Sequence, residues 1–401
     1  MSRALPPRVD WPIVAPLALA LLCLPIARSL VSVAWVLLAA VLALRAVRRE
    51  LDLPRELVFG TICCIVAWGI SIGGSRDPSA TLRAWLAWSG MLLPVLAVAS
   101  RRDRAGLPPA LQALWLAGSL LLGAWLIVEM RLGWHLLSGR FPGLSYPMMP
   151  NPNSAAQYLL LLFCWSFGFA LLARGRAAGW WHAAWAGSAL LLACCHSRAS
   201  WPAFALATVF SSWRARRPKM TWVAAMTWVA AAVFVAGNWM LPQSLWDRAL
   251  QLTRLEDVSI LGRLQGWVAA LRMIARRSFT GEGLGAWKPA YELVRSPEFP
   301  RDWPHAHNFY LGTLAETGFL GLLGFGLLMW GFRDAWRAGL RAPDPRPEEL
   351  GITAALLGTA VVGLFDVAWA GEPGFAFLAL AAFTMRMRHA PPASLTPRES
   401  G

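Results

Sequence analysis

The chain has 401 residues, of which 57% are hydrophobic and only 15% charged, and its mean hydropathy is +0.48. This composition excludes a water-soluble globular enzyme, because soluble domains contain about 25% charged residues. The formal net charge of +15 would indicate a nucleic-acid partner in a soluble chain. Here the basic residues lie in short clusters between apolar runs, which membrane topology and anionic lipids explain better than nucleic acid.

Apolar runs long enough to cross about 30 Å of hydrocarbon recur along the sequence. They predict an all-α integral membrane protein with about twelve transmembrane helices. Two of the runs, 200–214 and 372–386, are short and carry the weakest signal. The expected spans are 11–27, 29–45, 57–73, 84–100, 110–128, 154–173, 178–195, 200–214, 221–241, 309–331, 351–370 and 372–386.

Arg and Lys concentrate in the connections that share one side of the membrane with both termini. The positive-inside rule therefore places both termini in the cytoplasm. The long outer segment at 242–308 has room for helices of its own, so function is expected there. The sequence accordingly divides into a nine-span bundle at 1–241, a partly helical outer loop domain at 242–308, and three spans with a cytoplasmic tail at 309–401.

The outer turn HSRAS, at 196–200, holds Arg198 at the depth of the lipid headgroups. An arginine at this depth is either an anchor to the headgroups or a ligand for the pyrophosphate of a lipid-linked substrate. The sequence of the turn leaves both interpretations open.

Apolar residues recur at helical spacing over 260–274, which predicts a helix lying along the membrane surface. Arg263 falls inside this apolar stripe, whereas Arg272 falls on the opposite, solvated side. A guanidinium beside a dry surface is costly unless it meets an anion. Arg263 is therefore expected either to grip a phosphate or to form an ion pair with a carboxylate such as Glu282 or Glu292.

Two of the six histidines, His305 and His307, lie just outside the span at 309–331. A histidine at the mouth of a span suits proton transfer from a sugar hydroxyl, because its unperturbed pKa lies near neutrality. It can equally be an interfacial residue held by hydrogen bonds. Glycines at every third position from Gly318 to Gly324 would let a neighbouring helix approach closely and hold the histidine end rigid.

Two acidic residues lie within expected spans: Glu316 about two turns below His307, and Asp366 about one turn from the outer end of its helix. Ionisable side chains inside a bilayer usually face a cavity. Both acids are therefore expected to line an outward-facing site bordered by His307 and Arg198, unless Glu316 only pairs with an arginine. The sequence lacks the motifs for metal-nucleotide binding, phosphate loops and zinc or serine hydrolysis, so no metal and no cofactor is expected.

The run from His307 and Asn308, through nine residues, to Gly318 and Gly321 matches the pattern H-[NSQ]-x9-G-x-x-[GTY]. On these residues the chain resembles bacterial O-antigen ligases and the related protein O-oligosaccharyltransferases. Further stretches similar to segments of this family are NPNSAAQYL at 151–159, SRAS at 197–200, GRLQGW at 262–267 and GEGLGAW at 281–287.

The resemblance implies a glycosyltransferase C-like membrane enzyme of the bacterial inner membrane. It would join an undecaprenyl-pyrophosphate-linked glycan to the lipid A core oligosaccharide on the periplasmic face. By position, His307 corresponds to the essential histidine of the family, and Arg198 and Arg263 to its essential outer-loop arginines. The residues expected to bind substrate are Asn308, Arg140, Asn153, Asp366 and His305.

Residue chemistry and resemblance together predict that Arg198 and Arg263 bind the pyrophosphate, while His307 acts as general base and deprotonates the acceptor. The displacement is expected to need no metal and to invert the anomeric configuration. The expected partners are the two lipid-anchored substrates and membrane lipids, without nucleic acid. An O-antigen polymerase or a protein O-oligosaccharyltransferase are the nearest alternatives. A lipid-linked glycan transporter is a further one, but it would be expected to show midplane ionisable residues and discontinuous spans, which the sequence does not indicate.

Overall fold

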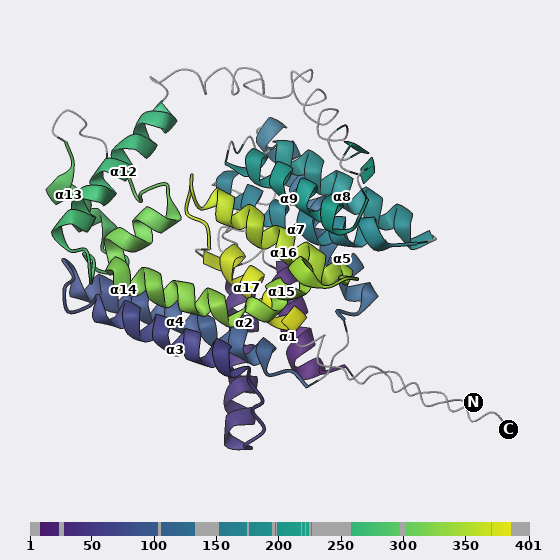
Figure 1. The fold of residues 1–401 in the computed structure, drawn as a ribbon, viewed down its shortest axis with the longest axis horizontal. Coiled ribbons are helices and arrows are strands. Elements are labelled where there is room, and N and C mark those ends of the chain that lie inside the picture. The colour runs from purple at the N-terminus through teal and green to yellow at the C-terminus, as the bar shows by residue number, and fades with distance from the viewer. Residues whose placement is uncertain are drawn as a thin grey trace.

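The structure, a computed structural model, is all-helical in the residues that it describes (Figure 1). Those residues are 9–23, 28–102, 106–132, 152–174, 176–194, 197, 199–217, 219–220, 222–223, 226, 258–296, 302–369 and 371–385. The helices are α1 (Trp11–Cys23), α2 (Arg28–Val47), α3 (Arg55–Ile70), α4 (Pro78–Ala99), α5 (Pro109–Leu132), α7 (Pro152–Leu172), α8 (Arg176–Cys194), α9 (Ser200–Arg214), α12 (Val258–Arg276), α13 (Trp287–Val294), α14 (Phe309–Gly331), α15 (Arg333–Arg341), α16 (Pro347–Val362) and α17 (Gly371–Met385).

The expected spans coincide with helices, with two exceptions. The span at 221–241 lies almost wholly outside the described residues, and the helix in the span at 351–370 ends at Val362. Four helical stretches are long and apolar enough to cross a membrane by length and composition: Ser29–Val47, Pro78–Ala99, Ala155–Leu172 and Phe309–Gly331. Several other helices are apolar but shorter. The all-α fold predicted from the sequence is therefore confirmed for the described residues, and the apolar helices indicate a membrane protein, while the count of about twelve spans stays a prediction.

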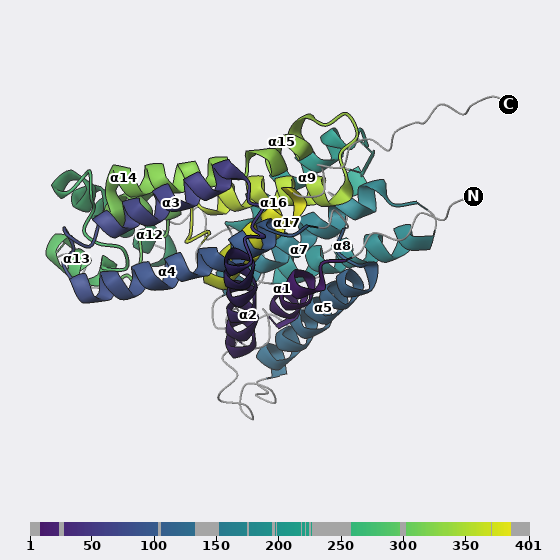
Figure 2. The ribbon, with the colours of Figure 1, turned by 90° about the horizontal axis from the view of Figure 1, so that it is seen from below.

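The interior of the protein is built around α7, which packs against α8, α9 and α16. Aromatic rings fill the space between these helices, with Phe163 in contact with Phe167, Trp185 and Phe204. A second group of helices extends away from this core: α3, α4 and α14 lie side by side, with α12 and α13 at their far end (Figures 1 and 2). Helices α12 and α13 are thereby held against the end of α14 at which Phe309 lies.

Glycines bring α14 close to α3. A Cβ added at Gly324 would lie 3.0 Å from the Cα of Cys64, and one added at Gly331 would lie 2.7 Å from the Cα of Leu57. Gly60 on α3 faces the backbone of Leu327 in the same way. The expected close helix approach is therefore confirmed at Gly324, where only small residues let the two backbones meet.

Gly318, in contrast, interrupts α14, because its backbone has the non-helical angles φ 66° and ψ −172°. The freed backbone groups bond to the loop before α13. The N–H groups of Phe319 and Leu320 donate to the carbonyls of Ser278 and Phe279 at 2.8 and 3.2 Å, and the carbonyls of Ala315 and Glu316 accept from Glu282 and Gly283 at 3.0 and 2.8 Å. The break thus fastens the loop to the half of α14 that carries the histidines.

Replacing Gly318 with alanine is expected to destabilise the protein by about 3 kcal/mol or more, because this backbone conformation is essentially restricted to glycine. A Cβ would also overlap the backbone of Phe279. The effect is measured by heating the protein in detergent and monitoring its unfolding by size-exclusion chromatography. Gly326→Ala is the matched control on the same helix, because no atom lies within 4 Å of its added Cβ; equal stability of the two variants would contradict this account of the break.

Candidate functional site

His307 lies in the turn that leads into α14, with a positive φ of 50°. Asn308 is the N-cap of the helix, and its side-chain oxygen accepts the N–H of Leu311 at 3.0 Å. The amide nitrogen of Asn308 donates to the carbonyl of Leu364 at 3.0 Å, and the N–H of Phe309 donates to the carbonyl of Gly363 at 2.8 Å. The start of α14 is thus tied to the loop that follows α16.

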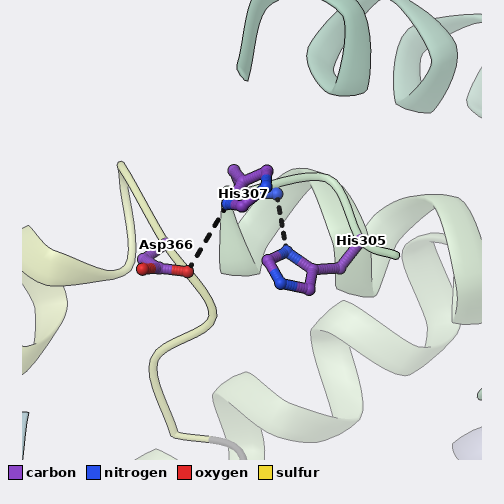
Figure 3. A group of neighbouring side chains, drawn as sticks. All are labelled: His305, His307 and Asp366. Atoms are coloured by element: carbon purple, nitrogen blue, oxygen red, sulfur yellow. Dashed lines mark hydrogen bonds and ion pairs between the residues drawn. The ribbon is translucent and has the colours of Figure 1, made fainter. Parts of the chain in front are cut away.

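Asp366 lies in this loop, not in a helix. The expectation of a continuous helix over 351–370 is wrong, because α16 ends at Val362. The carbonyls of Gly363 and Leu364 bond to the start of α14 and so leave the helical ladder. The resulting turn brings an Asp366 carboxylate oxygen to 3.8 Å from Nδ1 of His307 (Figure 3).

Asp366 is 3% exposed. Burial raises the pKa of its carboxyl, but the His307 ring, the N–H of Val367 and the His305 ring together outweigh burial and hold the pKa below its usual value. The N–H of Val367 donates to the carboxylate at 2.8 Å. Asp366 is therefore ionised at neutral pH and lies next to the His307 ring.

His305 packs against His307, with ring centroids 4.1 Å apart, and its Nδ1 accepts the N–H of His307 at 3.2 Å (Figure 3). Burial, with smaller contributions from His307 and Arg263, lowers the pKa of His305 to about 4, against the attraction of Asp366. His305 is therefore a neutral neighbour at physiological pH, and it fixes the backbone that carries His307.

Arg263 reaches the same place from α12. Its Nε donates to the carbonyl of Phe365 at 3.1 Å, one residue before Asp366. Its charge is also close enough to contribute to the lowered pKa of His305. A fixed cation thus lies beside the two histidines and the buried carboxylate.

Glu282, which the sequence offered as an ion-pair partner for Arg263, pairs instead with other arginines. Its carboxylate is 2% exposed and lies 3.0 Å from Arg76, 3.6 Å from Arg276 and 3.8 Å from Arg277. These arginines come from the α3–α4 connection and from the end of α12. Of the two carboxylates that the sequence offered, Glu282 is therefore engaged with other arginines.

Small residues let α12 approach the histidine loop. Gly262 faces the indole of Trp303, and a Cβ added at Gly266 would lie 3.0 Å from the carbonyl oxygen of Ala306. The Trp303 indole donates to Gln265 at 2.8 Å. Leu264 and Leu271 of the predicted apolar stripe are left exposed on α12, as is Val268, whereas Ile274 packs against buried residues.

The structure therefore brings together Arg263, His305, His307, Asn308 and Asp366. Arg198 and Arg140 lie outside the described residues. Asn153 lies in the first turn of α7, one turn before Gln157, whose amide donates to the carbonyl of Val367 at 3.1 Å. The N-terminal end of α7 thus contacts the same loop as Arg263 and His307.

Glu316 lines a pocket of about 220 Å³, together with His305, Asn308 and other residues. Its carboxylate accepts the N–H of Gly285 at 3.0 Å. Within the described part of the chain it makes no ion pair with an arginine. Sequence reasoning missed two of the three tryptophans that line this pocket, Trp68 and Trp88, since nothing in their local pattern sets them apart from the other tryptophans.

Three side chains of the site are also possible metal ligands. His305, His307 and Asp366 each offer a ligand atom, and these atoms lie within 4.8 Å of one another, so the group could hold a metal ion. The Nδ1 lone pair of His305 already accepts a hydrogen bond. The absence of a metal stays a prediction of the sequence, and a chelation experiment tests it.

Comparison with known proteins bears on this site directly. Residues 182–326 match the family model described as O-antigen ligase. A search of curated proteins finds no match. The matched segment contains Arg263, His305 and His307, whereas Asp366 and Asn153 lie outside it. Over this segment, which is about a third of the chain, the protein is similar to the O-antigen ligase family.

Proposed function

We propose that the protein is an O-antigen ligase, which transfers a glycan from undecaprenyl pyrophosphate to the lipid A core oligosaccharide. The observation that carries this proposal is the convergence of Arg263, His307 and Asp366 from three separate segments at the end of α14. A cation, a general base and a buried carboxylate are the groups that displacement of a pyrophosphate by a hydroxyl requires.

In the proposed reaction, His307 takes the proton of an acceptor hydroxyl. Its Nδ1 faces Asp366, which leaves Nε2 for the hydroxyl. The acceptor oxygen then bonds to the anomeric carbon of the donor, while the bond from that carbon to the pyrophosphate oxygen breaks and the electron pair leaves with the pyrophosphate. Attack opposite the leaving group inverts the anomeric configuration.

Each remaining group has a defined task. Arg263 stabilises the charge that develops on the departing pyrophosphate, and we assign the same role to Arg198. Asp366 holds the His307 ring and stabilises its protonated form. The free energy for transfer resides in the donor bond, so no nucleotide is consumed. Asn308, Arg140, Asn153 and His305 complete the proposed substrate contacts.

We also propose where the protein and its site lie in the cell. Both termini and the basic connections are placed in the cytoplasm by the positive-inside rule, and the site is placed on the periplasmic face of the bacterial inner membrane. The division into a nine-span bundle, an outer loop domain and a C-terminal group of three spans belongs to the same proposal. Two lipid-anchored substrates would then meet within the plane of the membrane.

Analysis of lipopolysaccharide from a strain that lacks the gene tests this function against its alternatives. Loss of a ligase leaves bare core while lipid-linked long chains accumulate. Loss of a polymerase would instead leave a single repeat attached to the core, and loss of a protein O-oligosaccharyltransferase would leave lipopolysaccharide unchanged. The purified protein should also form the conjugate from lipid-linked glycan and rough lipopolysaccharide, whereas transport across liposomes without conjugate would indicate a transporter.

Chelation is expected to leave transfer unchanged, because the fixed charge of Arg263 performs the task that a metal would otherwise perform. The initial rate of conjugate formation by purified protein is measured with and without EDTA. A loss of rate that added divalent metal restores would instead assign His305, His307 and Asp366 to a metal site.

A further inference from the structure

The pocket of about 220 Å³ beside the histidines is lined by both aromatic and polar side chains. Three indoles line it, from Trp68 on α3, Trp88 on α4 and Trp287 at the start of α13. The polar side chains that line it include His305 and Glu316. Apolar rings next to a carboxylate and a neutral histidine fit a ligand that is apolar on one face and rich in hydroxyls at its edge.

The indoles are held in place by their surroundings. Trp68 meets Trp88 edge to face, with centroids 5.4 Å apart, and the Trp287 indole donates to the carbonyl of Trp303 at 2.8 Å. Trp68 is only 3% exposed, yet its indole N–H has no hydrogen-bond partner among the described residues. A buried donor of this kind is costly unless a ligand or a water satisfies it.

The charge of the pocket argues against a phosphate. None of the described residues that line it is an arginine or a lysine, and Glu316 contributes a carboxylate. Arg263 bonds to Phe365 and does not line the pocket. The volume is also below the range of about 300 to 1,000 Å³ that is usual for pockets of larger ligands, which favours a single sugar ring over an extended glycan.

We propose that this pocket is the subsite for one sugar ring of the acceptor, an inference that rests on the proposed function. The first sugar of the donor is attached to a pyrophosphate, and none of the described residues that line the pocket offers a cation to bind that group. An acceptor sugar carries no such group at its reacting end. Seated on the indoles beside His305, it presents a hydroxyl to His307, whose ring centroid lies 4.1 Å from that of His305.

Trp88→Leu tests the subsite, with Trp85→Leu as its matched control. Both tryptophans lie on α4 and are partly buried, but Trp85 bonds to the carbonyl of Ile65 and does not line the pocket. Loss of the indole surface is expected to raise the KM for rough lipopolysaccharide about fivefold, because an aromatic contact contributes about 1 kcal/mol beyond its buried area. The KM for the lipid-linked donor, and kcat at saturating acceptor, are expected to stay unchanged.

A second measurement does not depend on how well the variant inserts in the membrane. Core oligosaccharide freed from lipid A should compete with rough lipopolysaccharide, and its inhibition constant should rise by the same factor in Trp88→Leu. A rise in donor KM would assign the pocket to the donor sugar and overturn the proposal, as would an equal effect of Trp85→Leu. If the wild-type protein formed no conjugate at all, the proposed function itself would fail.

Discussion

Replacing His307 with alanine is expected to lower the rate of glycan transfer by about 10²- to 10⁴-fold, the usual contribution of a general base. The loss should appear in kcat, since the imidazole acts on the acceptor proton as the new bond forms. The initial rate of conjugate formation by purified protein, at saturating concentrations of both substrates, measures it.

His182→Ala is the matched control, because His182 lies on α8 and bonds to the carbonyl of Ala178, away from the site. Both variants should elute from size-exclusion chromatography as the wild type does. Transfer by His307→Ala at a near-normal rate would remove the histidine from the mechanism, whatever its distance to Asp366.

Arg263→Ala is expected to lower kcat/KM for the lipid-linked donor by about 10²- to 10³-fold, comparable to the loss of one oxyanion-hole donor. Arg263→Lys should recover only part of this, because an ammonium keeps the charge but loses the planar fork that matches a phosphate. The measurement is the transfer rate as a function of donor concentration.

Arg272→Ala supplies the comparison for Arg263. Arg272 lies on the same helix, and its guanidinium donates to the carbonyl of Val294 at 2.7 Å, away from the histidine loop. Its removal should change donor kcat/KM much less. Equal losses of donor kcat/KM in the two variants would mean that any positive charge on α12 contributes to the same extent. The specific role of Arg263 would then be contradicted.

Much of the fold follows from local properties of the sequence. Apolar runs predict the helices, because a segment that crosses hydrocarbon must satisfy its own backbone hydrogen bonds. Likewise, the capping position of Asn308 follows from the side-chain oxygen that it presents to the first turn of α14. These features depend on a few neighbouring residues and need no knowledge of distant contacts.

The errors have long-range causes. Asp366 leaves the helix because backbone carbonyls of its loop bond to Phe309 and Asn308, residues distant in the sequence. Gly318 breaks α14 because the loop before α13 supplies alternative backbone partners. Neither contact is visible in a local pattern, since each depends on two segments that only the folded chain brings together.

The candidate site shows the same division. Residue types and the resemblance singled out His307 and Arg263, but they could not show that both lie beside a loop that carries Asp366. That arrangement depends on Gly262 and Gly266, which let α12 approach the loop at 303–306. The tryptophan-lined pocket depends likewise on helices α3 and α4, far from the motif in sequence.

The central claim is that a pyrophosphate binds beside His307 on the Arg263 side of the site. Electron cryo-microscopy of the protein with a non-transferable lipid-pyrophosphate-sugar analogue tests it most directly. The diphosphate should lie within hydrogen-bond distance of the Arg263 guanidinium, and the anomeric carbon should lie next to the His307 ring. A diphosphate bound elsewhere in the protein, with neither residue in contact, would contradict it.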